Sequence, residues 1–204
     1  MNPGNSIVVV SRWDRPTGWT QRLVQKGYRV LLYEHGTNPN NPYNLPANVG
    51  KEASVYLHYI VHSYDTLPTY VVFLHDEEHS WHHRGSIVDR VLAHEGKRHY
   101  YHNFNKVILG SIQKNQWWEK ISAWFDRYLA PYIGPREKYG DWTVGNVCCA
   151  QFVVHRDRIR QFPKRFYQDL YGWMMTTQLD SEVSARFLEW TWFLLFNRRH
   201  SYNS

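Results

Sequence analysis

Short apolar runs alternate with helix-like segments through the first half of the chain. Residues 6–11, 28–33 and 70–75 are β-branched or aromatic runs, which predict buried strands. Between them, residues 19–26 and 52–64 carry apolar positions at helical spacing, and Gly27 is placed to end the first helix. This order predicts an α/β fold with a mostly parallel central sheet and helices on both faces. We expect a single domain over residues 1–204, or the N-terminal module of a longer protein.

The second half has weaker periodicity. Residues 81–93, 116–128, 166–175 and 184–196 predict helices, and residues 148–155 predict a strand. Residues 35–45, 95–107 and 131–142 have no regular period and predict loops. No internal repeat or clean linker is visible, which agrees with one domain.

Composition narrows the classes of function. There are 24 Lys and Arg against 18 Asp and Glu, so a net charge of +6 favours an anionic partner. Aromatic residues reach 17%, enough to build a core and also to stack on bases or sugars. No apolar stretch is long enough to span a membrane. Cys148 and Cys149 are adjacent and form neither a disulfide framework nor a four-ligand zinc pattern, so a reducing compartment is the default.

An acidic cluster follows the third predicted strand, where ligands bind on parallel sheets. Asp76, Glu77 and Glu78 repel one another, and a divalent cation such as Mg²⁺ or Mn²⁺ would remove that repulsion. In an extended chain Asp76 and Glu78 point the same way and Glu77 points to the opposite face. The cluster is therefore either a bridge between protein, metal and diphosphate or a solvated acidic turn.

Histidines beside this cluster permit a different interpretation. His75 and His79 have the spacing of a zinc hydrolase motif, but that motif needs a helix and the run before His75 predicts a strand. Zinc hydrolysis is therefore the less favoured alternative. His82 either contacts a substrate or lies in a wet loop.

Three further groups have both a functional and an ordinary interpretation. Asn48, Gly50 and Lys51 open the clearest helix, whose start either binds an anion or is simply capped. Arg12 follows the first strand, where it either pairs with a phosphate or lies on the surface. Glu189 interrupts an apolar helix and is either exposed or functional.

Six segments of the chain together resemble a known family. They include SIVVVSRW, YRVLLYEHG, LPTYVVFLHDEEH and FLEWTWFLLF, in this order. They are similar to a family of small proteins of fungi, algae and large algal viruses that looks like a compact form of the GT-A nucleotide-sugar glycosyltransferases. The nearest resemblance is to the N-terminal glycosyltransferase domain of a chlorovirus protein.

This resemblance implies a GT-A-like fold. It also implies transfer of a sugar from a UDP-sugar, similar to UDP-glucose, to a hydroxyl of a glycan or glycoprotein. The reaction would use Mn²⁺ or Mg²⁺, and retention of the anomeric configuration is favoured. Asp76 and Glu78 would bind the metal, with Glu in place of the second Asp of the family motif. The implied donor-binding residues are Arg12, Tyr33, Glu34, Asn48, Gly50, Lys51, His75, Asp76 and Glu77. The implied acceptor and sugar side is His79, His82, Gln151, His155 and Trp190. Asp141, Asp180 and Glu189 are candidate catalytic carboxylates.

The competing hypothesis is a non-catalytic, basic, aromatic-rich module that binds carbohydrate or single-stranded nucleic acid. Such a module has no use for the acidic cluster, which would repel phosphates. We therefore expect a transferase that does not bind nucleic acid and acts in the cytoplasm, of the host cell if the protein is viral.

Overall fold

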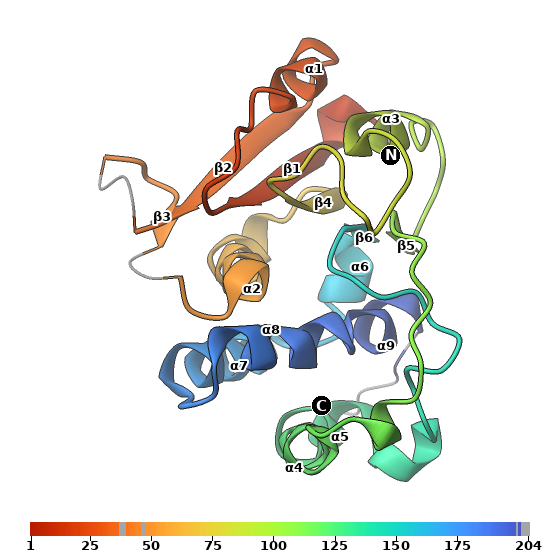
Figure 1. Cartoon of the computed structure of the whole chain (residues 1–204). Helices are drawn as coiled ribbons and strands as arrows, with labels where there is room; N and C mark the ends of the chain where they lie inside the picture. The colour runs from red at the N-terminus through yellow and green to blue at the C-terminus, as the bar shows by residue number, and fades with distance from the viewer. Residues whose placement is uncertain (37–39, 46–47, 199, 201–204) are drawn as a thin grey trace.

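The computed structural model describes residues 1–36, 40–45, 48–198 and 200. Within them, one six-stranded sheet has the order β3-β2-β1-β4-β6-β5 (Figure 1). Its strands are β1 (Ser6–Arg12), β2 (Arg29–His35), β3 (Asn44–Leu45), β4 (Tyr70–His75), β5 (Tyr101–Asn103) and β6 (Phe152–His155). The α/β class predicted from the alternating pattern is confirmed.

Strand β1 lies near the centre of the sheet because its side chains are apolar on both faces. Val8, Val9 and Val10 have no exposed surface, as expected of a strand in a parallel sheet covered on both sides. Strand β1 pairs in parallel with β2 on one side and with β4 on the other. The carboxyl ends of these three strands therefore lie at one edge of the sheet.

The sheet is only partly parallel, which corrects the expectation of a mostly parallel sheet. Strand β6 pairs antiparallel with β4, so that His155 lies opposite Tyr70. Strand β5 in turn pairs antiparallel with β6. The amino end of β6, not its carboxyl end, therefore reaches the edge at which β1, β2 and β4 end.

Helices cover both faces of the sheet (Figure 1). They are α1 (Thr20–Gln25), α2 (Lys51–Ser63), α3 (Ile87–Leu92), α4 (Trp118–Tyr128), α5 (Ala130–Ile133), α6 (Arg156–Ile159), α7 (Lys164–Thr176), α8 (Ser181–Glu189) and α9 (Trp192–Asn197). Side chains of α1 and α3 pack with Val8 and Val10 of β1. Side chains of α2, α7 and α8 pack with Val9, on the other face. Because successive side chains of β1 point to opposite faces of the sheet, this strand contributes to a hydrophobic core on each face.

Two predicted helices are shorter in the structure. The segment 81–93 contains only α3, because Gly85 takes a positive φ of 70° and Ser86 caps the helix by accepting a hydrogen bond from the Val88 amide. The predicted helix over 184–196 is divided into α8 and α9. At the break, the hydroxyl of Thr191 donates to the carbonyl oxygens of Phe187 (2.8 Å) and Leu188 (3.2 Å), a contact that bends helices.

Several short elements lie where loops were expected. They are β3, β5, α5 and the 3₁₀ turn Arg136–Tyr139. A further 3₁₀ turn, Ile112–Lys114, lies in a segment for which no element was predicted. Strands of two or three residues leave no periodic signal, because tertiary pairing alone defines them. Among the described residues, no helix combines the length and the apolar character needed to cross a membrane, as predicted.

Candidate functional site: a carboxylate-rich cleft at the strand ends

A cleft of about 460 Å³ opens where β1, β2 and β4 end. The chain passes from β1 to β2 on one side and later returns to β4 on the other, so this edge is the point at which the strand order reverses. Open α/β sheets bind their ligands at such points. The cleft is lined by Ser11, Trp13, Asp14, Arg15, His35, Asn48, Lys51, Glu52, His75, Asp76, Glu77, His82, Glu182, Ala185, Arg186 and Glu189.

Asp76 fixes the loop that follows β1. Its Oδ2 accepts hydrogen bonds from the backbone amides of Trp13 (2.9 Å) and Arg15 (3.2 Å). Its backbone carbonyl accepts a third from the indole Nε1 of Trp19 (2.9 Å). Asp76 therefore shapes one wall of the cleft as well as contributing a carboxylate to it.

Glu77, and not Glu78, joins Asp76 in the cleft. Strand β4 ends at His75, and the chain bends over the next residues, so the premise of an extended chain from Asp76 to Glu78 is wrong. Oε1 of Glu78 accepts hydrogen bonds from Ser86 (2.7 Å) and Arg22 (3.1 Å). Glu78 thus braces the start of α3, outside the cleft lining.

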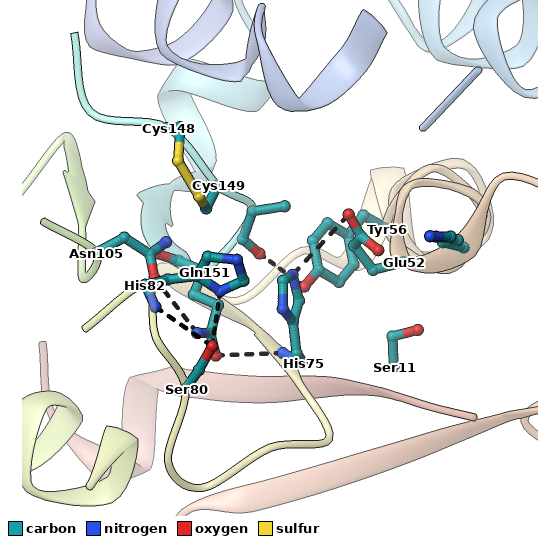
Figure 2. Close-up of polar contacts among 12 residues, drawn as sticks. Ser11, Glu52, Tyr56, His75, Ser80, His82, Asn105, Cys148, Cys149 and Gln151 are labelled. Atoms are coloured by element: carbon teal, nitrogen blue, oxygen red, sulfur yellow. Dashed lines mark hydrogen bonds and ion pairs between the residues drawn. A yellow bond between two sulfur atoms is a disulfide. The ribbon is translucent and has the colours of Figure 1, made fainter. Parts of the chain in front are cut away.

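A polar cluster forms part of the cleft wall, where the end of β4 meets α2. His75 Nε2 is buried, has no hydrogen-bond partner among the described residues, and lies 3.9 Å from Oε1 of Glu52. Figure 2 shows these two side chains directed toward each other. His82 is held by the hydroxyl of Ser80, 2.8 Å from its Nδ1. Burial, followed by the charge of His75, lowers the pKa of His82 to about 4, so its imidazole is neutral at neutral pH.

Glu189, at the end of α8, provides a carboxyl group with an unusual pKa. Burial, followed by the charge of Glu52, raises its pKa to about 7. The group therefore exchanges its proton near neutral pH, which is the property required of a general acid or base.

The two cysteines near Glu189 are joined to each other. A disulfide links Cys148 to Cys149, and one carboxylate oxygen of Glu189 lies within 4.8 Å of both sulfur atoms (Figure 2 shows the disulfide). Both cysteines are buried. The cysteine count excluded a framework of several disulfides, but it did not predict a bond between two adjacent cysteines.

The start of α2 brings positive charge to the opposite wall. Gly50 has a positive φ of 69°, and Asn48 and Lys51 line the cleft. Lys51 Nζ lies 3.7 Å from Oε2 of Glu182, which also pairs with Arg186 one helical turn along α8. The helix dipole and Lys51 can together attract an anion.

Four predicted donor residues lie outside the cleft lining: Gly50, which precedes α2, and three residues around the end of β2. Arg12 forms an ion pair with Glu34, whose other oxygen accepts a hydrogen bond from Asn41 (3.2 Å). Tyr33 is buried against Tyr43, with ring centroids 5.2 Å apart. These side chains stabilise the end of β2.

Two candidate catalytic carboxylates have structural roles elsewhere. Asp141 accepts hydrogen bonds from the hydroxyl of Ser111 and from the backbone amide of Ile112 (3.1 Å), and such bonds lower its pKa although burial opposes them. Asp180 caps α8 by accepting from the Glu182 amide (2.8 Å). Neither lines the cleft.

Of the predicted acceptor residues, only His82 lines the cleft. His155 lies at the far edge of the sheet, because β6 runs antiparallel. Gln151 is fully buried, and its amide bonds Asn105 (3.3 Å) beneath the polar cluster. Trp190 is buried at the break between α8 and α9, and His79 is exposed in the bend after β4.

The structure also removes the basis of the zinc hydrolase alternative. His75 ends a strand and His79 lies in a bend, so the two imidazoles do not share a helix face.

Several cleft residues were not predicted. They include Ser11, Asp14, Arg15, Glu182, Ala185 and Arg186. One signal was available: Glu182, Arg186 and Glu189 are spaced by four and three residues, which places them on one face of α8. Asp14 and Arg15 reach the cleft through the loop that Asp76 holds, and loop shape is not visible in sequence. Ser11 lies near the end of β1.

No curated protein and no solved structure matches this chain. A family model described as "Protein of unknown function (DUF3431)" matches residues 7–204. The chain therefore belongs to the DUF3431 family.

Proposed function

We propose that this protein is a metal-dependent glycosyltransferase that moves a sugar from a UDP-sugar to a hydroxyl of a glycan acceptor. The observation that carries the proposal is the cleft at the reversal of strand order, which holds Asp76, the start of α2 and Glu189 around one space. Its volume of about 460 Å³ lies in the usual range for small-molecule sites.

The charges of the cleft support a cation as part of the donor site. Six carboxylates line it (Asp14, Glu52, Asp76, Glu77, Glu182 and Glu189) against three cationic side chains (Arg15, Lys51 and Arg186). A diphosphate alone would be repelled by this excess of acid. Nucleic acid would be repelled for the same reason, which disfavours the binding-module alternative.

The donor atoms in the cleft fit Mn²⁺ or Mg²⁺, which prefer oxygen ligands. Asp76 and Glu77 would hold the ion, a pair that differs from Asp76 and Glu78 because Glu78 is engaged by Arg22 and Ser86. When bound, the metal supplies positive charge to the leaving diphosphate. Lys51 and the α2 amides would bind phosphate oxygens on the other side.

Glu189 is the group we assign to the acceptor. In transfer, the bond between the sugar carbon and the phosphate oxygen breaks, the diphosphate leaves with the electron pair, and the acceptor oxygen forms the new bond. If the anomer inverts, Glu189 accepts the hydroxyl proton, for which a pKa of about 7 is suited. If it is retained, as the resemblance favours, Glu189 stabilises the oxocarbenium-like transition state and the leaving phosphate accepts the proton.

The test is a screen of UDP-sugars for hydrolysis with and without Mn²⁺, followed by transfer to glycan acceptors. We expect Asp76→Asn and Glu77→Gln to lose metal-dependent turnover, and Glu119→Gln, an exposed carboxylate on α4, to retain it. Glu78→Gln distinguishes the two possible metal-ligand pairs. It should abolish metal-dependent turnover only if Asp76 and Glu78, the pair predicted from sequence, bind the ion.

Ligand-dependent stability distinguishes the transferase from the binding module. Stabilisation that needs UDP and Mn²⁺ together supports the transferase. Stabilisation by a single-stranded oligonucleotide that disappears with salt, without an effect of UDP and Mn²⁺, refutes it.

A further inference from the structure

Three histidines converge outside the cleft, on the sheet face covered by α1 and α3. His94 follows α3, His99 lies in the next loop, and His102 is on the edge strand β5. His102 pairs in register with Val153, whose side chain belongs to the core under α1 and α3. The register of β5 therefore directs His102 toward the end of α3, where His94 lies.

The nitrogen atoms of this triad are close enough to share one ion. His94 Nδ1 lies 2.8 Å from His99 Nε2, and one ring nitrogen from each of the three residues lies within 4.8 Å of the others. The rings of His94 and His102 are 4.0 Å apart. Tetrahedral zinc with bonds of roughly 2.0–2.1 Å places two nitrogens about 3.3 Å apart, so small side-chain rotations would reach that geometry.

The side chains of the triad have the chemistry that a metal requires. Each imidazole can offer a ring-nitrogen lone pair to an ion. All three side chains are half-buried, which limits competition from water.

We propose that His94, His99 and His102 form a binding site for a divalent transition metal ion, Zn²⁺, with water in the fourth position. Imidazole nitrogen suits zinc, whereas Mg²⁺ and Mn²⁺ prefer oxygen, and the triad contains no carboxylate. Lys97 and Arg90, whose charges act on His94, oppose a divalent ion and make the site weaker than an uncharged triad would be.

The ion would have a structural consequence. Within the part of the chain that the structure describes, strand β5 pairs only with β6, and three residues of edge strand are weakly held. A metal shared by His94 and His102 ties this strand to the end of α3 and closes the intervening loop. Metal binding would then stabilise the native state without touching the carboxylates of the cleft.

The test uses the full chain, freed of metal by a chelator and titrated with Zn²⁺ by calorimetry. We expect one ion per chain, and a thermal stabilisation by Zn²⁺ that Mn²⁺ does not reproduce at the same concentration. Substituted Co²⁺ provides a second measurement, since a tetrahedral site with three imidazoles gives an intense visible spectrum. Neither readout depends on catalysis.

Variants that each remove one histidine of the triad test where the ion binds. His99→Gln and His102→Gln should each weaken Zn²⁺ binding about tenfold or more. The control is His62→Gln, which removes an exposed member of the stacked His58–His62 pair on α2 and should bind as the parent does. Circular dichroism of the metal-free variants shows whether they fold.

Three results would overturn the site: no Zn²⁺ binding by the parent chain, unchanged binding in the folded triad variants, or loss of binding only in His62→Gln. The test is separate from that of the transferase, because triad variants should keep their stabilisation by UDP with Mn²⁺. Loss of that stabilisation in Asp76→Asn leaves the zinc site unaffected.

Discussion

The imidazole Nε2 of His75, at the end of β4, lies 3.9 Å from Oε1 of Glu52, in the first turn of α2 (Figure 2). The same Glu52 raises the pKa of Glu189 on α8. One carboxylate of α2 thus acts on a strand end and on a second helix, and it connects three of the elements that line the cleft.

Replacing Glu52 should change the titration of Glu189. Glu52→Gln removes a negative charge, so the pKa of Glu189 should fall from about 7. Arg186→Gln removes a charge that lowers this pKa and should shift it upward. Carboxyl NMR of labelled glutamate measures both shifts. Shifts of the same sign in the two variants would contradict the assignment.

Glu189 should also make stability depend on pH. Its pKa is about 7 in the folded chain against 4.5 in the reference state, so between these values the folded chain binds a proton that the unfolded chain releases. The free energy of unfolding attributable to Glu189 therefore falls as pH rises through this window, by on the order of 3 kcal/mol. Glu189→Gln should gain stability relative to the parent from pH 5 to pH 8 in urea unfolding. A constant difference between the two proteins would refute the shift.

Gly50 should tolerate no side chain. Its φ is 69°, and an added Cβ would lie 2.0 Å from Sδ of Met174 on α7. Gly50→Ala should cost about 2 kcal/mol or more in chemical denaturation. The matched control is Gly172→Ala, where nothing lies within 4 Å of the new Cβ and helix propensity predicts a gain of up to about 1 kcal/mol. Equal effects of the two substitutions would exclude the close approach of α7 as the cause.

If the chain is the transferase proposed above, Trp81 should contact the acceptor. It is 77% exposed, and its ring lies 4.1 Å from that of the cleft residue His82. An exposed indole beside a cleft offers a face for a sugar ring. Trp81→Ala should raise the acceptor KM several-fold while leaving the donor KM and the melting temperature unchanged. A change in the donor KM alone would place Trp81 on the wrong side of the reaction.

The cysteine pair can be checked without any assay of function. Thiol titration of the unfolded protein should detect no free thiol before reduction and both cysteines after it, because Cys148 and Cys149 are bonded to each other. Detection of both thiols in the unreduced protein would show that the bond is absent under the conditions of purification.

Patterns of local sequence were sufficient for the elements that are long or buried. Strand β4 has the predicted bounds, and α2 begins one residue before the predicted start, because apolar spacing reports burial directly. The edge strand β5 was not predicted, and the direction of β6 was not assigned. Both depend on pairing between distant segments of the chain. The sequence indicated where a sheet would bind a ligand, and the structure places a cleft there.

Individual site residues were predicted less well, for a physical reason. A strand end fixes the position of His75, but the bend after it decides that Glu77 lines the cleft and Glu78 pairs with Arg22. The same loop geometry brings Arg15 to the cleft through Asp76. Bends and loop contacts of this kind depend on the packed fold, and no spacing rule reports them.

The antiparallel pairing of β5 and β6 affects how this fold can diversify. Asn103 lies opposite Phe152, so the chain leaves the sheet and rejoins it at adjacent points, and residues 104–151 form an excursion between them. Lengthening such an excursion costs little entropy, because its ends are already held together. Insertions and deletions there can remodel the surroundings of His82 and Gln151 while the register of the four parallel strands is preserved. Relatives with different excursions would then differ in the surroundings of these two residues while keeping the cleft where the parallel strands end.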